Sequence, residues 1–167
     1  GPYGLGYLYV APKWREGGRP IEASWMTRRG AEDFTRLVDY TDEYRPGARR
    51  FDMGGFSQFV LSPMALAGVT QLLRWGVERV QSSVGRLTTV IAEEAMKMGC
   101  SVLPANRRVG HMVGIRFPDG IPAGLAARLS EKKVYVSIRG DSVRVAPHLY
   151  NSEDDAARFL AVLGEFV

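Results

Sequence analysis

The sequence predicts an α+β fold in which helices cover an antiparallel or mixed sheet, and three observations support this prediction. The chain has 167 residues, of which 46% are hydrophobic, so it can bury the core of about one domain or slightly more. From residue 61 onward, segments with the apolar spacing of helices alternate with short apolar runs that are typical of strands. The single cysteine excludes a scaffold held together by disulfides.

Residues 1–60 show little periodicity and are rich in Gly and Pro. A glycine-rich start over residues 1–6 leads into residues 8–10, an apolar run that predicts a short buried strand. One short helix is expected over residues 31–40, because the apolar residues there fall on one helical face. The rest predicts long loops, which in compact domains are usually functional or lack the protein that normally surrounds them.

Residues 61–167 have the pattern of a complete small α+β domain that begins with a long connecting helix. Ser62 and Pro63 supply an N-cap and a first-turn proline for this helix. Gly99 is a suitable end for a second helix. The elements are expected in this order: helices over about 62–80 and 84–98, a strand over 109–117, a helix over 122–132, strands over 134–138 and 142–146, and a last helix that opens at Ser152.

Charge and hydropathy argue against two kinds of partner. Lys and Arg number 22 against 18 Asp and Glu, which gives a net charge of +4, but the basic residues are interleaved with acids. This scatter does not predict a nucleic-acid interface. No run approaches the roughly 18 apolar residues that a membrane span needs, and the first residues do not resemble a signal peptide. We expect a cytoplasmic protein that binds neither nucleic acid nor membrane.

Metal and thiol chemistry are also disfavoured. His111 and His148 are far apart in the sequence, and neither forms a metal-binding spacing with the other or with Cys100. Cys100 lies beside apolar residues, where a buried structural thiol is favoured over a nucleophile. The glycine-rich start is not followed by the Gly-Lys-Ser/Thr of a phosphate-binding P-loop.

Arginines beside glycine turns are the best candidates for binding. Arg139 and Arg144 flank one such turn, and residues 49–50, both Arg, precede another. The planar guanidinium can bind a carboxylate or phosphate with two parallel hydrogen bonds, and glycine lets backbone N–H groups approach an anion closely. The pattern indicates an anionic small molecule. The alternative is that these arginines are solvated or pair with Asp52 and Asp141.

Three motifs, GPYGLGYLYV at residues 1–10, RRFDMG at residues 49–54 and RVAPHLYNSEDD at residues 144–155, together resemble segments of the class V aminotransferase superfamily, whose members are fold-type I enzymes that use pyridoxal phosphate. Residues 1–10, GPYGLGYLYV, resemble the glycine loop and strand that follow the cofactor-binding lysine. Residues 49–54, RRFDMG, resemble the segment before the connecting helix. Residues 144–155, RVAPHLYNSEDD, resemble the C-terminal signature. The resemblance is strongest to the isopenicillin-N-epimerase-like and cysteine-desulfurase-like branches.

The resemblance implies a division of the chain into parts of two domains. Residues 1–60 would be the C-terminal end of the large domain that binds pyridoxal phosphate, and residues 61–167 the small C-terminal domain. The lysine that forms the Schiff base would lie upstream of Gly1, so no catalytic residue and no metal ligand is expected in this chain. The parent enzyme would be a homodimer that acts on an amino-acid-like small molecule.

The resemblance also implies roles for particular residues. Arg144 would bind the substrate α-carboxylate, with Arg139 as a second candidate. Gly54, Gly55 and Ser57 would contact the cofactor phosphate of the partner subunit. The desulfurase pattern has Thr where this chain has Gly55, and the loop before Arg144 lacks the desulfurase cysteine, so sulfur transfer is disfavoured.

The expected function is that of the C-terminal portion of such an enzyme, with transamination, epimerisation or lyase chemistry in the longer parent. The isolated chain is not expected to catalyse. Two alternatives stay open: a portion of a kynureninase-like hydrolase that uses the same arginine, and a non-catalytic binding or dimerisation domain.

Overall fold

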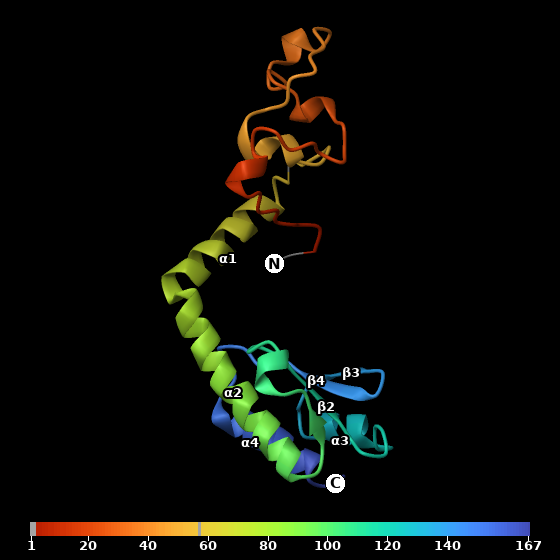
Figure 1. Cartoon of the computed structure of the whole chain (residues 1–167). Coiled ribbons are helices and arrows are strands. Elements are labelled where there is room, and N and C mark those ends of the chain that lie inside the picture. Colours follow the sequence, from red (N-terminus) through yellow and green to blue (C-terminus); the bar gives the residue numbers. More distant parts are fainter. Residues whose placement is uncertain (1–2, 57) are drawn as a thin grey trace. The chain divides into compact units, whose positions relative to one another are not determined.

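A computed structural model describes residues 3–56 and 58–167 (Figure 1). The chain divides into two compact units, Gly1–Gln71 and Leu72–Val167, and each is described here by itself. The assignment of residues 1–60 to the end of a larger domain stays a prediction. The predicted α+β class is confirmed, because the second unit combines helices with one four-stranded antiparallel sheet.

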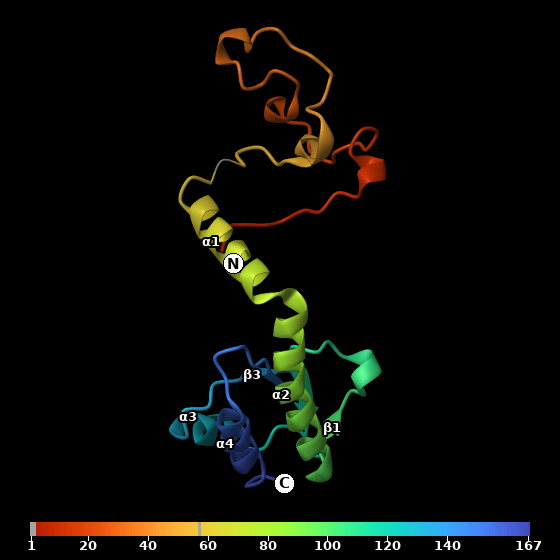
Figure 2. The same ribbon diagram turned by 90° about the vertical axis from the view of Figure 1, so that its left-hand side faces the viewer.

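The sheet of the second unit has the strand order β1-β2-β4-β3, and all its neighbouring strands are antiparallel. Helices α2 and α4 pack against each other beside it (Figures 1 and 2). The strands are β1 (Ser101–Val102), β2 (Val113–Arg116), β3 (Ser137–Arg139) and β4 (Ser142–Val145). The α-helices are α1 (Leu61–Trp75), α2 (Val77–Lys97), α3 (Leu125–Glu131) and α4 (Glu153–Leu163).

One hydrophobic core joins the sheet to its helices. Side chains alternate between the two faces of a strand, so Val113, Ile115 and Val143 are buried while their neighbours Gly114 and Arg144 are exposed. The buried strand residues pack with apolar residues of three helices, including Ile91, Ala95, Leu125, Leu129, Phe159 and Leu163. The sheet therefore has one packed face and one open face.

Two helix ends follow from local sequence as predicted. The last turn of α2 is closed by Gly99, which has φ +92°, and the Cys100 N–H donates to the Ala95 carbonyl at 3.0 Å; this is the Schellman arrangement that glycine favours. At the start of α4, Ser152 and Asp155 form a capping box, in which each side chain accepts a hydrogen bond from the other residue's backbone N–H.

Other boundaries differ from the prediction. The first helix stops at Trp75 instead of near residue 80, because Gly76 has φ +81° and interrupts the helix before α2. The helix starts at Leu61, so Ser62 and Pro63 lie inside its first turn rather than serving as cap and first residue. The two-residue strand β1 was not predicted, since it is too short to show alternation.

The first unit contains short 3-10 turns and loops and, among its described residues, no α-helix before residue 61. The predicted strand over 8–10 is wrong, because this segment has no ladder partner in the described part of the unit. The predicted helix over 31–40 is reduced to a 3-10 turn, Phe34–Arg36. Phe34 and Val38 are largely exposed, so no apolar packing stabilises a longer helix there.

Arg50 holds part of the first unit together. Its side chain is 9% exposed, and its guanidinium donates to the carbonyls of Glu16 and Gly18. Gly18 is needed at this contact, because an added Cβ would lie 2.5 Å from the Phe51 ring and from a backbone oxygen. Arg50 is thus a structural residue, which corrects its inclusion among the arginines expected to bind a ligand or pair with an acid.

Lys133 closes helix α3 with an unfavourable backbone conformation, and its replacement by glycine is expected to stabilise the second unit. Its φ is +56°, while the Val134 N–H donates to the Leu129 carbonyl at 2.9 Å. Because an L-residue is strained at positive φ and glycine is not, Lys133→Gly should raise the free energy of unfolding by about 0.5–1 kcal/mol. Urea unfolding measures this change. Lys132→Gly is the control. Because Lys132 has φ −84°, glycine at this position should lower the free energy of unfolding. A change of the same sign in both variants would contradict the prediction.

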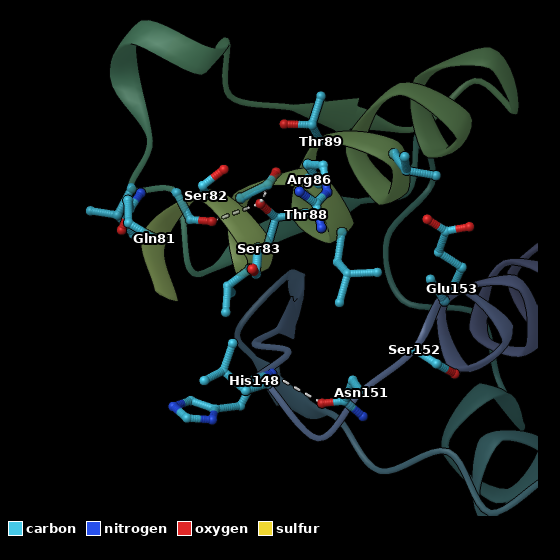
Figure 3. A pocket seen from close by; sticks show the side chains of 18 of the residues that line it. Gln81, Ser82, Ser83, Arg86, Thr88, Thr89, His148, Asn151, Ser152 and Glu153 are labelled. Atoms are coloured by element: carbon cyan, nitrogen blue, oxygen red, sulfur yellow. Dashed lines mark hydrogen bonds between the residues drawn. The ribbon is translucent and has the colours of Figure 1, made fainter. Parts of the chain in front are cut away.

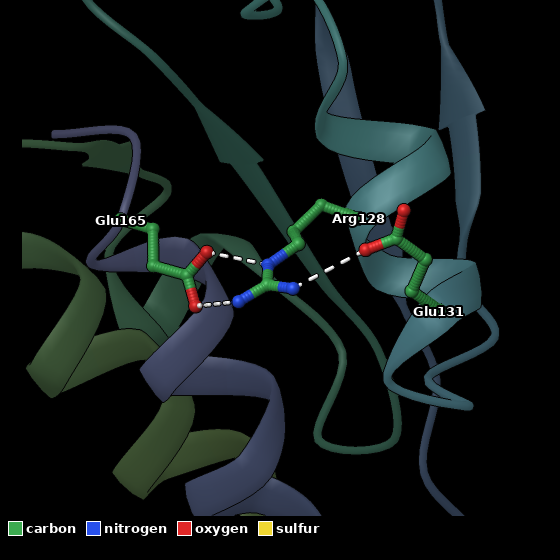
Figure 4. Close-up of polar contacts among 3 residues, drawn as sticks. All are labelled: Arg128, Glu131 and Glu165. Atoms are coloured by element: carbon green, nitrogen blue, oxygen red, sulfur yellow. Dashed lines mark hydrogen bonds and ion pairs between the residues drawn. The ribbon is translucent and has the colours of Figure 1, made fainter.

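A charged cluster joins α3 to the C-terminal segment (Figure 4). Arg128 binds Glu165 with two hydrogen bonds of 2.6 and 3.0 Å and Glu131 with one of 3.2 Å. The hydrogen bonds that Arg128 donates lower the pKa of Glu165 below its ordinary value of 4.5, and the hydrogen bonds that Arg128 donates to both acids raise its own pKa. The ion pair therefore favours the charged carboxylate in the folded state.

This pair predicts an acid-dependent contribution to stability. A carboxylate whose pKa is lowered by folding stabilises the protein above its ordinary pKa and loses this effect as the pH falls through the folded-state pKa. Glu165→Gln should therefore lower the thermal midpoint slightly at about pH 7 and by less at about pH 3. Glu93→Gln, an exposed carboxylate of α2 outside the cluster, is the control, and a loss of equal size at both pH values would contradict the prediction.

Candidate functional site

The open face of the sheet carries the arginines that the sequence singled out. Arg144 on β4 is paired in register with Gly114 on β2 and with Ser137 on β3. Arg139, at the end of β3, is paired with Ser142. Because paired residues of antiparallel strands share a face, Arg139 and Arg144 lie on the same open face, on adjacent strands. The structure thus brings these two predicted residues together.

A tight turn sets the spacing of the two arginines. β3 and β4 are joined only by Gly140 and Asp141, and Gly140 has φ +57°. A two-residue hairpin with glycine at its first central position matches the twist of the flanking strands. The hairpin fixes the register, so Arg139 and Arg144 are diagonal neighbours, whose Cα atoms are about 7–8 Å apart in such sheets.

Arg144 is free to bind an anion. Among the described residues, no acid lies within ion-pair distance of its guanidinium, and its Nη2 donates a long hydrogen bond of 3.5 Å to Ser137 Oγ. Its neighbour Gly114 has no side chain to cover it. Arg139 is also exposed, and its Nη1 donates to the Ile138 carbonyl at 3.1 Å. Both guanidinium groups keep unused donors that face water.

Asp141 does not neutralise Arg144, because it pairs with a third arginine. Arg116 Nε lies 3.0 Å from Asp141 Oδ1, and Arg116 belongs to the open face because it follows the buried Ile115 on β2. Sequence reasoning missed Arg116, although the alternation in residues 113–116 could have placed it there. Of the alternative expected from sequence, the pairing of Asp141 with Arg139 or Arg144 is therefore wrong, whereas both arginines are exposed to solvent.

The predicted phosphate contacts lie in the first unit. The Gly54 N–H donates to Glu22 Oε1 at 2.7 Å, and Gly55 has φ +71° with no atom near the position of an added Cβ. An added Cβ at Gly54 would lie 2.8 Å from Glu22 Oε1 and 3.5 Å from Ser24 Oγ. Ser57 lies outside the described residues. The Gly54 N–H thus already donates to a charged oxygen, in a space that only glycine leaves open.

This contact tests whether a phosphate group fits the turn. Carboxylate and phosphate oxygens are both strong acceptors for backbone N–H groups. The Glu22 carboxylate occupies the position that a phosphate oxygen would take at Gly54, at a normal distance for a charge-assisted hydrogen bond. The single Gly54 N–H is therefore already used by Glu22, and the phosphate contact expected at this turn stays a prediction.

A pocket of about 1130 Å³ lies beside α2 in the second unit (Figure 3). It is lined by α2, by the loop over 105–110 and by the segment from His148 into α4. The rings of His148 and Tyr150 stack with centroids 5.5 Å apart, and both side chains are exposed. The pocket contains neither Arg139 nor Arg144.

Several classes of site find no support in the described part of the chain. Cys100 is buried, and burial raises the pKa of its thiol, as expected for a structural cysteine. No group of three or more His, Cys, Asp or Glu residues among those described could hold a metal ion. No described helix is long and apolar enough to cross a bilayer.

Comparison with known proteins adds independent information. No family model matches the chain. The chain is 27% identical over 153 residues to the uncharacterized aminotransferase YcbU of Bacillus subtilis (strain 168), an alignment that covers 91% of this chain and 38% of the relative. Its fold is similar to an apo cysteine desulfurase from Thermococcus onnurineus NA1, with a TM-score of 0.59, 24% identity, and coverage of 77% of this chain and 36% of that one.

A NifS-like protein is similar in fold as well, with a TM-score of 0.57, 19% identity, and coverage of 72% of this chain and 37% of that one. These likenesses confirm the resemblance to the C-terminal part of class V aminotransferase-like proteins and the α+β fold that it implies. The chain spans 38% of the length of the curated relative. The relatives are aminotransferase and cysteine desulfurase-type proteins, each longer than this chain.

Proposed function

We propose that this chain is the C-terminal portion of a pyridoxal-phosphate enzyme of the class V aminotransferase type that acts on an amino acid. The observation that carries this proposal is Arg144, which stands exposed and without an acid partner among the described residues. It also opens the segment that resembles the family's C-terminal signature. The likeness to an aminotransferase over 91% of the chain supports the same proposal.

In this proposal Arg144 binds the substrate α-carboxylate and Arg139 assists it. A guanidinium that holds a carboxylate with two hydrogen bonds fixes the orientation of the substrate Cα, which contributes to catalysis by positioning. Gly54 and Gly55 contact the cofactor phosphate through backbone N–H groups, with Ser57 as a further contact. Pyridoxal phosphate, when bound, supplies a ring that accepts electrons from the bond that breaks. Transamination, epimerisation and lyase chemistry all need a bound substrate carboxylate and a bound cofactor.

The proposed enzyme is a cytoplasmic homodimer, and the lysine that holds the cofactor lies in the part of the longer parent that precedes this chain. Helix α1 supports the presence of more protein in the parent, because the helix contains no buried residue and a single charged residue, Arg74. Its large apolar side chains are exposed, among them Met64, Leu66 and Leu73, and apolar surface of this kind is normally covered by other protein. The same observation favours a second candidate, a non-catalytic binding or dimerisation domain. A kynureninase-like hydrolase stays an alternative within the enzyme class.

Absorbance spectroscopy tests the proposal. The 167-residue chain and the longer polypeptide that contains it are each incubated with pyridoxal phosphate and then reduced with borohydride. We expect a Schiff-base absorbance band and one specific reduced adduct in the longer protein only. A specific adduct on one of the lysines of this chain would contradict the proposal that the cofactor-binding lysine lies outside it. If neither protein binds pyridoxal phosphate, the non-catalytic domain is favoured.

A further inference from the structure

Two guanidinium groups lie above the same strand on the open face of the sheet. Arg144 reaches over β3 from the neighbouring strand, because its Nη2 donates to Ser137 Oγ at 3.5 Å. Arg139 belongs to β3, and its Nη1 donates to the Ile138 carbonyl at 3.1 Å. Residues two positions apart in a strand share a face and lie about 7 Å apart. The groups anchored at Ser137 and Arg139 are therefore neighbours.

No acid neutralises this pair of cations. Among the described residues, neither Arg139 nor Arg144 forms an ion pair. The acid of the adjoining turn, Asp141, is held by Arg116, whose Nε lies 3.0 Å from Asp141 Oδ1. Two like charges on neighbouring strands repel each other, which disfavours their arrangement unless an anion binds between them. The two unpaired cations thus indicate a ligand with two negatively charged groups.

Small neighbours leave room for a ligand beside both arginines. Arg144 is paired in register with Gly114 and Ser137. Arg139 is paired with Ser142. None of these three neighbours has a side chain that could cover a guanidinium group. β3 is the last strand in the order of the sheet (Figure 1), so no described strand lies beyond Arg139. A ligand can therefore reach both arginines at once.

We propose that the ligand of the open face carries two anionic groups, and that Arg139 binds the second of them while Arg144 binds the first. This inference rests on the proposed function where it takes the first group as the α-carboxylate of an amino acid. The second group is then on the side chain, as a carboxylate or a phosphate. The substrate class is an amino acid with an acidic or phosphorylated side chain. Arg139 determines this specificity and does more than assist Arg144.

Two ligands that differ by one charge test this inference on the 167-residue chain. Glutarate has the two carboxylates of glutamate at the same spacing but no amino group, so it needs no cofactor to bind. Its monomethyl ester has a similar length and a single carboxylate. NMR signals of the Arg139 and Arg144 amides follow the titration with each ligand, and chloride holds the ionic strength constant. The methyl signals of Leu163, whose side chain is 0% exposed, report whether the second unit stays folded.

The native chain should bind glutarate about two- to fivefold more tightly than the ester, a modest gain because both arginines are exposed to water. Arg139→Gln should bind the two ligands with equal Kd values. Arg139→Lys keeps the charge without the planar fork and should keep part of the difference. Arg107→Gln is the control, because it removes another exposed arginine of the second unit and should keep the whole difference.

The outcomes separate this inference from the proposed function. Equal Kd values for glutarate and the ester in the native chain, both weakened by Arg144→Gln, would overturn the inference and leave the carboxylate role of Arg144 intact. An equal loss of the difference in Arg107→Gln and Arg139→Gln would also overturn it, because net charge would then explain the gain. If Arg144→Gln binds both ligands as the native chain does, the inference and the carboxylate role of Arg144 both fail.

A third ligand identifies the second anionic group. Phosphonobutyrate has a phosphonate in place of one carboxylate of glutarate, so it represents a phosphorylated side chain. A larger loss of affinity in Arg139→Gln for phosphonobutyrate than for glutarate supports a phosphorylated amino acid as the substrate. A smaller loss supports an amino acid with a carboxylate side chain. If Arg139→Gln loses affinity for neither ligand, the inference is overturned.

Discussion

Ile115→Ala is expected to lower the free energy of unfolding of the second unit by about 2–5 kcal/mol, because it removes buried methyl groups and leaves a cavity. Ile115 is 0% exposed. It lies on β2, with Val102 of β1 and Val143 of β4 as its register partners. Loss of its side chain therefore opens the middle of the packed face, where the surrounding strands cannot move in without breaking their pairing.

Urea unfolding followed by amide signals of residues 72–167 measures this effect. Val109→Ala is the control, because Val109 is 48% exposed and its truncation should change stability by less than about 0.5 kcal/mol. Ile115→Val removes one methyl group and should cost about 0.5–1.5 kcal/mol, which keeps the test informative if the alanine variant does not fold. Equal losses for Ile115→Ala and Val109→Ala would contradict the assignment of the core.

The elements that the sequence predicted best are those specified by neighbouring residues. The capping box of Ser152 and Asp155, the end of α2 at Gly99 and the hairpin around Gly140 all depend on interactions within a few positions of the chain. Such interactions are visible as local patterns.

The elements that the sequence missed depend on distant partners. Residues 8–10 have the apolar character of a strand, but a strand needs a neighbour to pair with, and the described part of the first unit offers none. β1 is a strand only because Ser101 and Val102 pair with Arg116 and Ile115. The helix break at Gly76 was not foreseen, because glycine is tolerated within helices at a modest cost.

The candidate site shows the same division between local and distant information. That Arg139 and Arg144 share a face follows from a two-residue turn and the period of a strand. The pairing of Arg116 with Asp141 joins residues 25 positions apart, and the contact between Glu22 and Gly54 spans 32. Neither has a signal in the local sequence. The buried role of Arg50 was likewise hidden, since its acceptors are distant backbone carbonyls.

Arg144→Gln is expected to reduce kcat/KM of the proposed longer enzyme for its proposed amino acid substrate by about 10²–10³-fold, which corresponds to about 2.7–4 kcal/mol. The variant keeps a polar side chain of moderate length but loses the charge and the paired donors that hold a carboxylate. Arg144 is exposed on the open face and contributes no buried contact, so the fold should be unaffected. Arg107→Gln, on the short 3-10 turn Ala105–Arg107, is the control and should leave kcat/KM unchanged.

The comparison of two substrates separates carboxylate binding from a general effect on activity. The amine that corresponds to the amino acid without its α-carboxylate cannot use Arg144, so the native enzyme and Arg144→Gln should process it at the same low rate. Arg144→Lys keeps the positive charge without the planar fork and should fall between the native enzyme and Arg144→Gln. If Arg144→Gln slows both substrates equally, Arg144 does not bind the carboxylate, and the open face of the sheet is then better explained as a surface covered by protein.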